Sequence, residues 1–397
     1  MSQGIRIGAR LLAGGIVAAS LAAASAVTAQ AATNYRTLAA ITVRYNNTPV
    51  SASVSLADAR RATFTETGSP AELFNRVTHG QRQFIGLRDR AGDVFGTWTL
   101  PMAAPTVEIC NSFSARVSAN AHLVALWLAA LANGVDLSSY NNVVVFTPTL
   151  PGCGAGGFAD FNGQAAFVAK ESPVAAMAAV ASHEVGHTFT LSHAGKLECK
   201  GPQFAPGSTC EIDPYGDDFD MMGSSRIVAG GADPLQAFSL ARIQARPAGQ
   251  IQTIAAGTGG TFRLTGIGQA TGEGIKLLMI PRQRPAALLP VAQCVHALAG
   301  ACASPFGYQN LTIEAHSQGV LFHLTAATTA TNMTTLLRND QGYKESYVGE
   351  SLTDPATGVR ITVTDRSNGG ATVVLSKQSA SALARATESS AAVQRAR

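Results

Sequence analysis

Three histidines and one glutamate lie in a single stretch of eleven residues, 183–193. His183 and His187 are four positions apart, so on a helix their imidazoles share one face and can bind one metal ion. Glu184 cannot be a ligand on that face, but it can stand beside a metal-bound water. His193 completes the set only if the helix ends after His187 and the chain turns back. Three nitrogen ligands with one open position are typical of a catalytic zinc site.

This residue set predicts hydrolysis at one catalytic Zn²⁺. Zinc lowers the pKa of bound water toward about 7 and polarises a carbonyl group. Glu184 would then act as general base, taking the proton of the water and passing it to the leaving amine. The competing interpretation is a helix whose histidines are satisfied in the core. The clustering of three of the eight histidines at ligand spacing argues against that interpretation.

A second feature follows His193, in the stretch 215–223 with the sequence YGDDFDMMG. A methionine in a tight turn can form an apolar floor beneath a three-histidine zinc site, and Met222 is the candidate. The alternative is that Met222 is an ordinary core or turn residue.

The same stretch is rich in acidic residues. Asp217, Asp218 and Asp220 could hold Ca²⁺, but they lack the spacing of a known calcium loop, and a solvated acidic turn is favoured. Tyr215 can approach the metal site, but a packing role is favoured for it.

The histidines need a rigid, buried helix. Ser172 and Pro173 favour a helix start, as an N-cap serine with proline at the first helical position. The helix is expected over 173–189, and its small and apolar residues predict that most of it is buried. The patterns upstream predict strands at 35–45, 83–87, 94–100 and 143–147, helices at 71–77 and 120–132, and an edge strand at 164–170.

After about residue 246 the pattern changes to short strand-like segments separated by turn residues. Segments of this kind predict a β-sandwich or a related β-domain. The expected strands are 260–266, 275–280, 311–315, 320–326, 359–365 and 371–376. We therefore expect a catalytic domain at 32–247, a β-sandwich-like domain at 248–377 and a disordered Ala/Ser-rich tail at 378–397.

The first 31 residues are typical of a signal peptide. Arg6 and Arg10 precede an apolar stretch at 11–27, and an A-x-A cleavage motif stands at 29–31. An uncleaved membrane anchor is the alternative, but the stretch is Ala/Gly-rich and marginal in length. We expect a secreted protein, extracellular or periplasmic, without stable membrane association after cleavage.

The composition excludes some functions. With 46% hydrophobic and 14% charged residues, the chain can bury a sizeable core and is not a charge-rich disordered protein. Its net charge of +4 comes without a basic run or stripe, which argues against a nucleic-acid partner.

The chain has six cysteines, and in an exported protein an even number indicates disulfides. Proximity favours Cys199–Cys210 and Cys294–Cys302, which leaves Cys110 with Cys153, although the sequence alone permits 15 pairings. Zinc ligation by cysteine is disfavoured because no C-x-x-C motif occurs.

The extended histidine motif with its methionine turn resembles the metzincin zinc peptidases. The sequence HEVGHTFTLSHA at 183–194, followed by YGDDFDMMG at 215–223, is similar to the motifs of the gametolysin/autolysin group. The resemblance is strong over 110–225 and weaker over 35–110 and 250–377. It implies an α+β fold, with a twisted mixed sheet, two long helices and a cleft between two lobes. It also implies roles for five residues: His183, His187 and His193 as zinc ligands, Glu184 as base and Met222 as the Met-turn methionine.

One residue departs from the family motif, which has glycine where this chain has Thr190. That glycine lets the chain turn so that the third histidine reaches the metal. A β-branched residue in a left-handed conformation costs about 1–2 kcal/mol. We therefore expect either a turn that is built differently or a looser site.

Together these features predict a monomeric, secreted zinc endopeptidase that acts on extracellular or cell-wall proteins. Two alternatives remain open: a secreted binding or adhesion protein with a degenerate protease domain, and a zinc hydrolase of non-peptide amides or esters.

Overall fold

A computed structural model describes most of the chain after residue 33. The described residues are 34–104, 116–149, 156–159, 163–170, 173–200, 209–223, 250–269, 274–282, 292–294, 308–317, 319–326, 334–340, 342–367 and 369–379. The predicted signal peptide and the final 18 residues of the predicted tail lie outside them, as do Cys110, Cys153 and Cys302.

The first half of the described chain is organised around one long strand, β1 (Asn34–Tyr45). The other strands of its sheet are β2 (Arg82–Ile85), β3 (Asp93–Leu100), β4 (Asn142–Thr147), β5 (Gly157–Ala159) and β6 (Ala165–Ala169). β1 pairs in parallel with β2, β3 and β4, and β4 pairs in parallel with β6. β5 is antiparallel to β6 and ends the sheet, which is therefore mixed.

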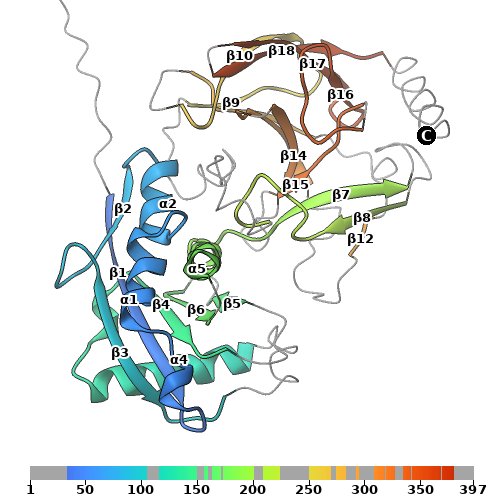
Figure 1. Ribbon diagram of the computed structural model, residues 1–397. Coiled ribbons are helices and arrows are strands. Elements are labelled where there is room, and N and C mark those ends of the chain that lie inside the picture. Colours follow the sequence, from blue (N-terminus) through green and yellow to red (C-terminus); the bar gives the residue numbers. More distant parts are fainter. Residues whose placement is uncertain are drawn as a thin grey trace, which may run out of the picture. The chain divides into compact units, whose positions relative to one another are not determined.

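Helices cover both faces of this sheet (Figure 1). They are α1 (Leu56–Arg60), α2 (Pro70–Val77), α4 (Arg116–Ala132) and α5 (Val174–Thr188), with short turns η1 (Val50–Ala52), η2 (Arg61–Thr65) and η3 (Leu137–Ser139). Successive residues of a strand point to opposite faces. Leu38 and Ala40 of β1 accordingly lie in the core with α1, α2 and α5, whereas Ala39 and Ile41 lie in the core with α4.

Two further sheets share a second core. The larger contains β7 (Ala194–Lys200), β8 (Thr209–Asp213), β9 (Ile251–Thr253), β11 (Leu277–Pro281), β12 (Ala292–Cys294), β13 (Tyr308–Ala315), β14 (Val320–Ala326) and β15 (Thr334–Leu336). The smaller contains β10 (Gly260–Thr265), β16 (Ser351–Asp354), β17 (Val359–Ser367) and β18 (Gly370–Lys377). The strand orders are β12-β8-β7-β15-β14-β13-β11-β9 and β10-β18-β17-β16. Buried side chains from both sheets form one hydrophobic cluster.

The larger sheet crosses residue 247, where the sequence predicts a domain boundary. β7 pairs in parallel with β15, and β8 pairs in parallel with β12. β7 and β8 themselves form an antiparallel pair that is joined by the predicted disulfide Cys199–Cys210. Strands that follow the histidine motif directly therefore share a sheet with strands from the C-terminal region.

The chain is of the α+β class expected, and strands or helices are present in every segment where the patterns predicted them. Two details of the prediction are wrong. β6 is not an edge strand, because β5 pairs along its outer side. The helix begins at Val174 rather than at Pro173, which is the extended residue before it. Among the helices in the described ranges, none has the length and apolar character needed to cross a membrane.

Candidate metal centre

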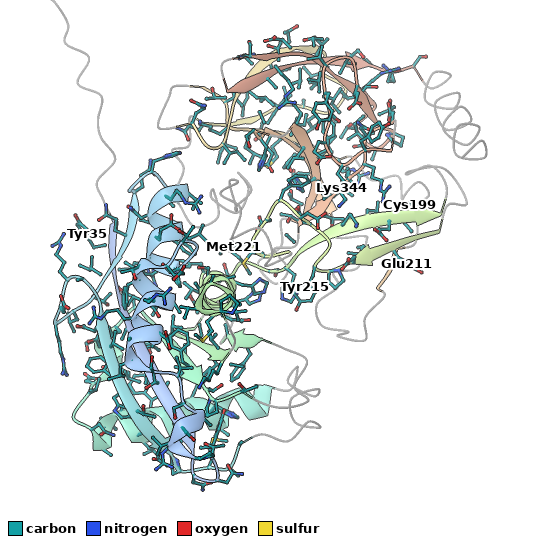
Figure 2. All side chains as sticks on the ribbon, viewed as in Figure 1. Tyr35, Cys199, Glu211, Tyr215, Met221 and Lys344 are labelled. Atoms are coloured by element: carbon teal, nitrogen blue, oxygen red, sulfur yellow. A yellow bond between two sulfur atoms is a disulfide. The ribbon has the colours of Figure 1, made fainter. Side chains whose placement is uncertain are left out.

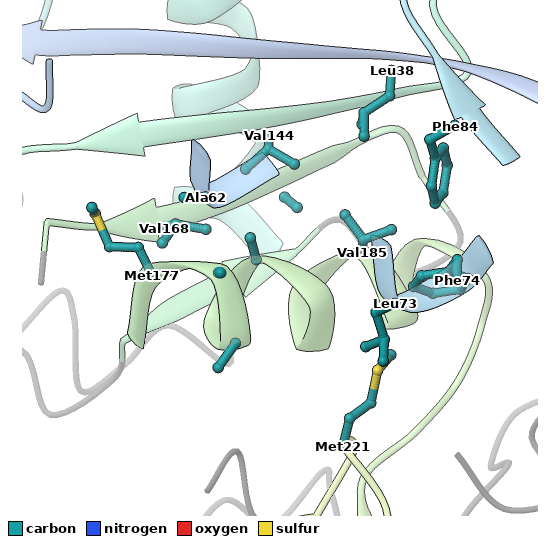
Figure 3. Close-up of a cluster of buried hydrophobic side chains, with 14 of the residues drawn as sticks. Leu38, Ala62, Leu73, Phe74, Phe84, Val144, Val168, Met177, Val185 and Met221 are labelled. Atoms are coloured by element: carbon teal, nitrogen blue, oxygen red, sulfur yellow. The ribbon is translucent and has the colours of Figure 1, made fainter. Parts of the chain in front are cut away.

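Helix α5 carries most of the candidate site and is held from two sides. Met177 and Val185 lie in the hydrophobic core between α5 and the first sheet. Figure 3 shows Val144 and Val168 of that sheet on one side of the helix and Met221 on the other. A helix packed in this way gives its side chains fixed positions.

Three histidines meet at the C-terminal end of α5. Nitrogen atoms of His183, His187 and His193 lie within 4.8 Å of one another. The Nε2 atoms of His187 and His193 are 3.2 Å apart. A tetrahedral zinc ion with bonds of about 2.0–2.1 Å requires about 3.4 Å between its nitrogen ligands. The three side chains are therefore close to the spacing that one ion needs, as the sequence predicts.

Backbone carbonyls set the orientation of two of these rings. Nδ1 of His183 lies 2.7 Å from the carbonyl oxygen of Met221, and Nδ1 of His187 lies 2.7 Å from that of Leu191. A carbonyl oxygen only accepts, so each Nδ1 carries the proton and each Nε2 keeps its lone pair. Such bonds to the far ring nitrogen are the usual support of metal-binding histidines.

All three imidazoles are kept neutral, which is the form that binds metal. Burial lowers the pKa of His183, and burial together with His183 lowers the pKa of His187 to about 3. Burial and the two other histidines lower the pKa of His193 well below its ordinary value. The site therefore offers three unprotonated nitrogens at neutral pH.

The turn that brings His193 back is a Schellman motif with Thr190 at its left-handed position. The Leu191 N–H donates to the carbonyl of Gly186 at 3.2 Å, and the Thr190 N–H donates to that of His187 at 2.9 Å. This pair of bonds defines the motif. Thr190 has φ 66°, the conformation that glycine adopts most easily. Of the two outcomes expected for Thr190, a differently built turn is therefore wrong: the usual turn forms with threonine in place of glycine, and His193 joins the other two histidines.

Two methionines form the floor beneath the histidines. Met221 and Met222 are both fully buried. A Cβ atom at Gly186 would stand 2.4 Å from Sδ of Met222 and 3.0 Å from Cε of Met221. The Ala194 N–H, directly after His193, donates to the carbonyl of Met222 at 2.9 Å. The segment 215–223, called the Met-turn below, therefore packs against α5 and also fixes the chain at the third histidine.

Glu184 lies beside the histidines and is 6% exposed. Burial raises the pKa of its carboxyl to about 8. A Cβ atom added to Gly157, the first residue of β5, would stand 2.8 Å from Cγ of Glu184. The edge strand of the first sheet therefore passes against the side chain of Glu184.

Tyr215 lies at the site, as the sequence allowed. Its ring centroid is 4.1 Å from that of His193 and 6.1 Å from that of His183. Figure 2 shows it near α5, in the segment that follows β8. Burial and the charge of Glu184 raise the pKa of its phenol to about 12, so the hydroxyl stays protonated.

The predicted solvated acidic turn is wrong for two of its three aspartates. Asp217 and Asp220 are fully buried. Oδ1 of Asp217 accepts from the Phe219 N–H at 2.8 Å, and Oδ1 of Asp220 accepts from the Met222 N–H at 2.7 Å. These carboxylates shape the Met-turn from inside, because they satisfy backbone donors that would otherwise be buried without a partner.

His323, a buried histidine in the C-terminal region that the sequence patterns did not single out, contacts the Met-turn. Nε2 of His323, on β14, lies 3.2 Å from Oδ2 of Asp217, and its Nδ1 lies 3.4 Å from Oε1 of Glu314, on β13. Glu314 also lies 3.2 Å from Nε2 of His316. Burial would lower the pKa of His323, but Asp217, Glu314 and Asp220 raise it.

His316 and His323 are both buried beside Glu314, and the pairing of β13 with β14 brings His323 to this carboxylate. Asp218, the exposed member of the acidic group, pairs instead with Lys344.

Comparison with known proteins gives no family. No model of a protein family matches this chain, and no curated protein matches it. A chain in a solved structure titled "Structure of a chaperone-substrate complex" aligns with 49% of this chain at 18% identity, with a TM-score of 0.26. The alignment spans 29% of that chain. A similarity at this level supports no conclusion about fold or function.

Proposed function

We propose that this protein is a secreted zinc-dependent endopeptidase. The proposal rests on the convergence of three neutral imidazoles, those of His183, His187 and His193, beside the buried carboxylate of Glu184. This donor set fits Zn²⁺, which takes three nitrogen ligands and keeps one position open in catalytic sites. When bound, Zn²⁺ would polarise the scissile carbonyl and lower the pKa of water.

The chain's own groups supply the proton transfers. Glu184 takes a proton from the attacking water and delivers it to the leaving amine. A cation nearby would bring its raised pKa back toward the neutral range that suits a general base. Tyr215, protonated and next to His193, can donate a hydrogen bond to the oxyanion that forms on the scissile carbonyl.

The edge strand β5 supports a peptide as substrate. It ends the first sheet among the described residues, and its first residue lies against Glu184. An extended peptide can add to such an edge through main-chain hydrogen bonds. A peptide paired along β5 would pass the carboxylate, which favours an internal peptide bond as the one that is cut.

The family and the compartment are part of the proposal. The histidine spacing, the left-handed turn at Thr190 and the packing of Met222 under the helix support a metzincin of the gametolysin/autolysin type. The Cys199–Cys210 disulfide supports an oxidising compartment, as expected for an exported protein.

The test combines metal content with cleavage. The purified protein should contain one zinc per chain and should cut casein or a peptide library, and a chelator should abolish the cutting. Glu184→Ala should keep zinc and lose about 10²–10⁴-fold in rate, the usual contribution of a general base. Glu211→Ala, which removes an exposed carboxylate on β8, is the matched control and should leave the rate unchanged.

Three results would count against the proposal. Zinc bound without cleavage of any peptide would favour a binding protein. Cleavage of esters or non-peptide amides alone would favour a different hydrolase. An unchanged rate in Glu184→Ala would remove Glu184 from the mechanism.

A further inference from the structure

Two arginines lie on neighbouring strands of the first sheet, at the C-terminal end of α5. β1 and β2 pair in parallel with Asn34 opposite Arg82, so Arg36, two residues along, projects from the same face. Both guanidinium groups lie over the ring of Phe189, at 4.7 Å for Arg36 and 5.8 Å for Arg82. Phe189 is the residue that caps the end of α5.

Neither arginine has an acidic partner among the described residues. Arg82 is only 8% exposed, and its buried Nε has no hydrogen-bond partner. Arg36 donates from Nε to Oδ1 of Asn142 at 3.0 Å, and that amide is neutral. The contrast is Arg282, whose side chain is buried and lies 3.0 Å from the carboxylate of Asp354.

The two guanidinium charges repel one another, and that of Arg82 is buried whereas that of Arg36 is half-buried. Burial and the charge of Arg82 lower the pKa of Arg36. A buried charge is normally paired, because its lost hydration must be replaced. The negative end of the α5 dipole compensates only in part, and neither guanidinium donates to a carbonyl there in the described structure. Two positive charges that have no acidic partner among the described residues favour binding of an anion.

We propose that Arg36 and Arg82 form a binding site for one inorganic dianion, phosphate or sulfate. Two fixed positive charges match two negative ones, and the planar guanidinium groups present paired N–H donors to tetrahedral oxyanions. Arg36 keeps part of its surface in solvent, so an ion can enter. The bound dianion would join β1, β2 and the end of α5. This inference does not depend on the proposed peptidase activity.

Isothermal titration with inorganic phosphate tests the site. In a chloride buffer the wild-type protein should bind one phosphate per chain, sulfate should compete, and acetate should bind at least tenfold more weakly. Arg36→Gln and Arg82→Gln should each raise the dissociation constant at least tenfold. Arg90→Gln is the matched control: it removes the same charge from an exposed arginine that stacks on Tyr35, and it should bind like the wild type.

Thermal unfolding gives a second readout that a purely structural role would not produce. Without phosphate or sulfate, Arg82→Met should melt at the same temperature as the wild type or higher, because an unpaired buried charge is removed. With phosphate, the wild type should gain stability and Arg82→Met should not. Three results would overturn the proposal: phosphate binding that persists in both variants, as for an ion held at the metal centre; equal binding of acetate; or no binding by the wild type.

Discussion

Thr190→Gly tests the strain at the turn that carries His193. Thr190 has φ 66°, and a left-handed conformation costs an L-residue about 1–2 kcal/mol. Glycine removes that cost but loses roughly 0.5–1 kcal/mol because its unfolded chain is more flexible. The net gain expected for the variant is about 0.5–1 kcal/mol, or about 1–3 °C in melting temperature for a domain of this size.

Calorimetric unfolding is the assay, with zinc affinity measured by chelator competition. Zinc affinity should stay the same, because the Schellman bonds that place His193 are made by the backbone. Thr190→Ala and Thr190→Asn serve as controls. Alanine removes the hydroxyl but keeps the left-handed strain, and asparagine tolerates that conformation better. The expected order of stability is Gly above Asn above Ala.

Two results would refute this reasoning. If alanine stabilises as much as glycine, the strain does not come from the left-handed backbone. If glycine weakens zinc binding, the Thr190 side chain itself holds the turn in place.

The remaining predictions concern the floor, the tyrosine and the buried histidine. Gly186→Ala should destabilise the protein by about 1–3 kcal/mol because the added methyl group overpacks against Met222, and it should weaken zinc binding. A higher melting temperature, as alanine gives at an exposed helical glycine, would contradict this. Tyr215→Phe should keep zinc and slow cleavage by about 10²–10³-fold, the usual loss on removing one oxyanion donor; an unchanged kcat would leave the ring only a packing role. His323 has a pKa above its ordinary 6.5, so the stability it contributes with Asp217 is complete below pH 6.5 and is lost as pH rises through the folded-state pKa. Melting temperatures followed upward from about pH 6 should therefore fall more steeply for the wild type than for His323→Gln, and parallel curves would contradict this.

Local rules were sufficient to identify the candidate ligands. The spacing of His183 and His187 places them on one helical face whatever surrounds the helix, because helical periodicity is a property of the backbone. The same holds for the alternating strands, whereas the left-handed backbone at Thr190 was not expected for a β-branched residue. Proximity along the chain also sufficed for Cys199 and Cys210, which lie on a short antiparallel pair.

Burial of polar residues and long-range strand pairing could not be predicted from local sequence patterns. The acidic run at Asp217 and Asp220 has the composition of a solvated turn, yet both carboxylates are buried, since the chain folds them inward to satisfy backbone donors and to meet His323. β6 has the pattern of an edge strand, and a three-residue partner too short to recognise covers it.

By itself, then, the sequence determined which groups meet at the candidate metal centre, because that set is local: one helix, one turn and one methionine segment. Only the tertiary structure decided what supports those groups. His323 lies more than a hundred residues after Asp217, and Arg36 meets Arg82 only through the pairing of β1 with β2. Charge interactions depend on distance in space, and no pattern of residue types along the chain specifies which distant strands become neighbours.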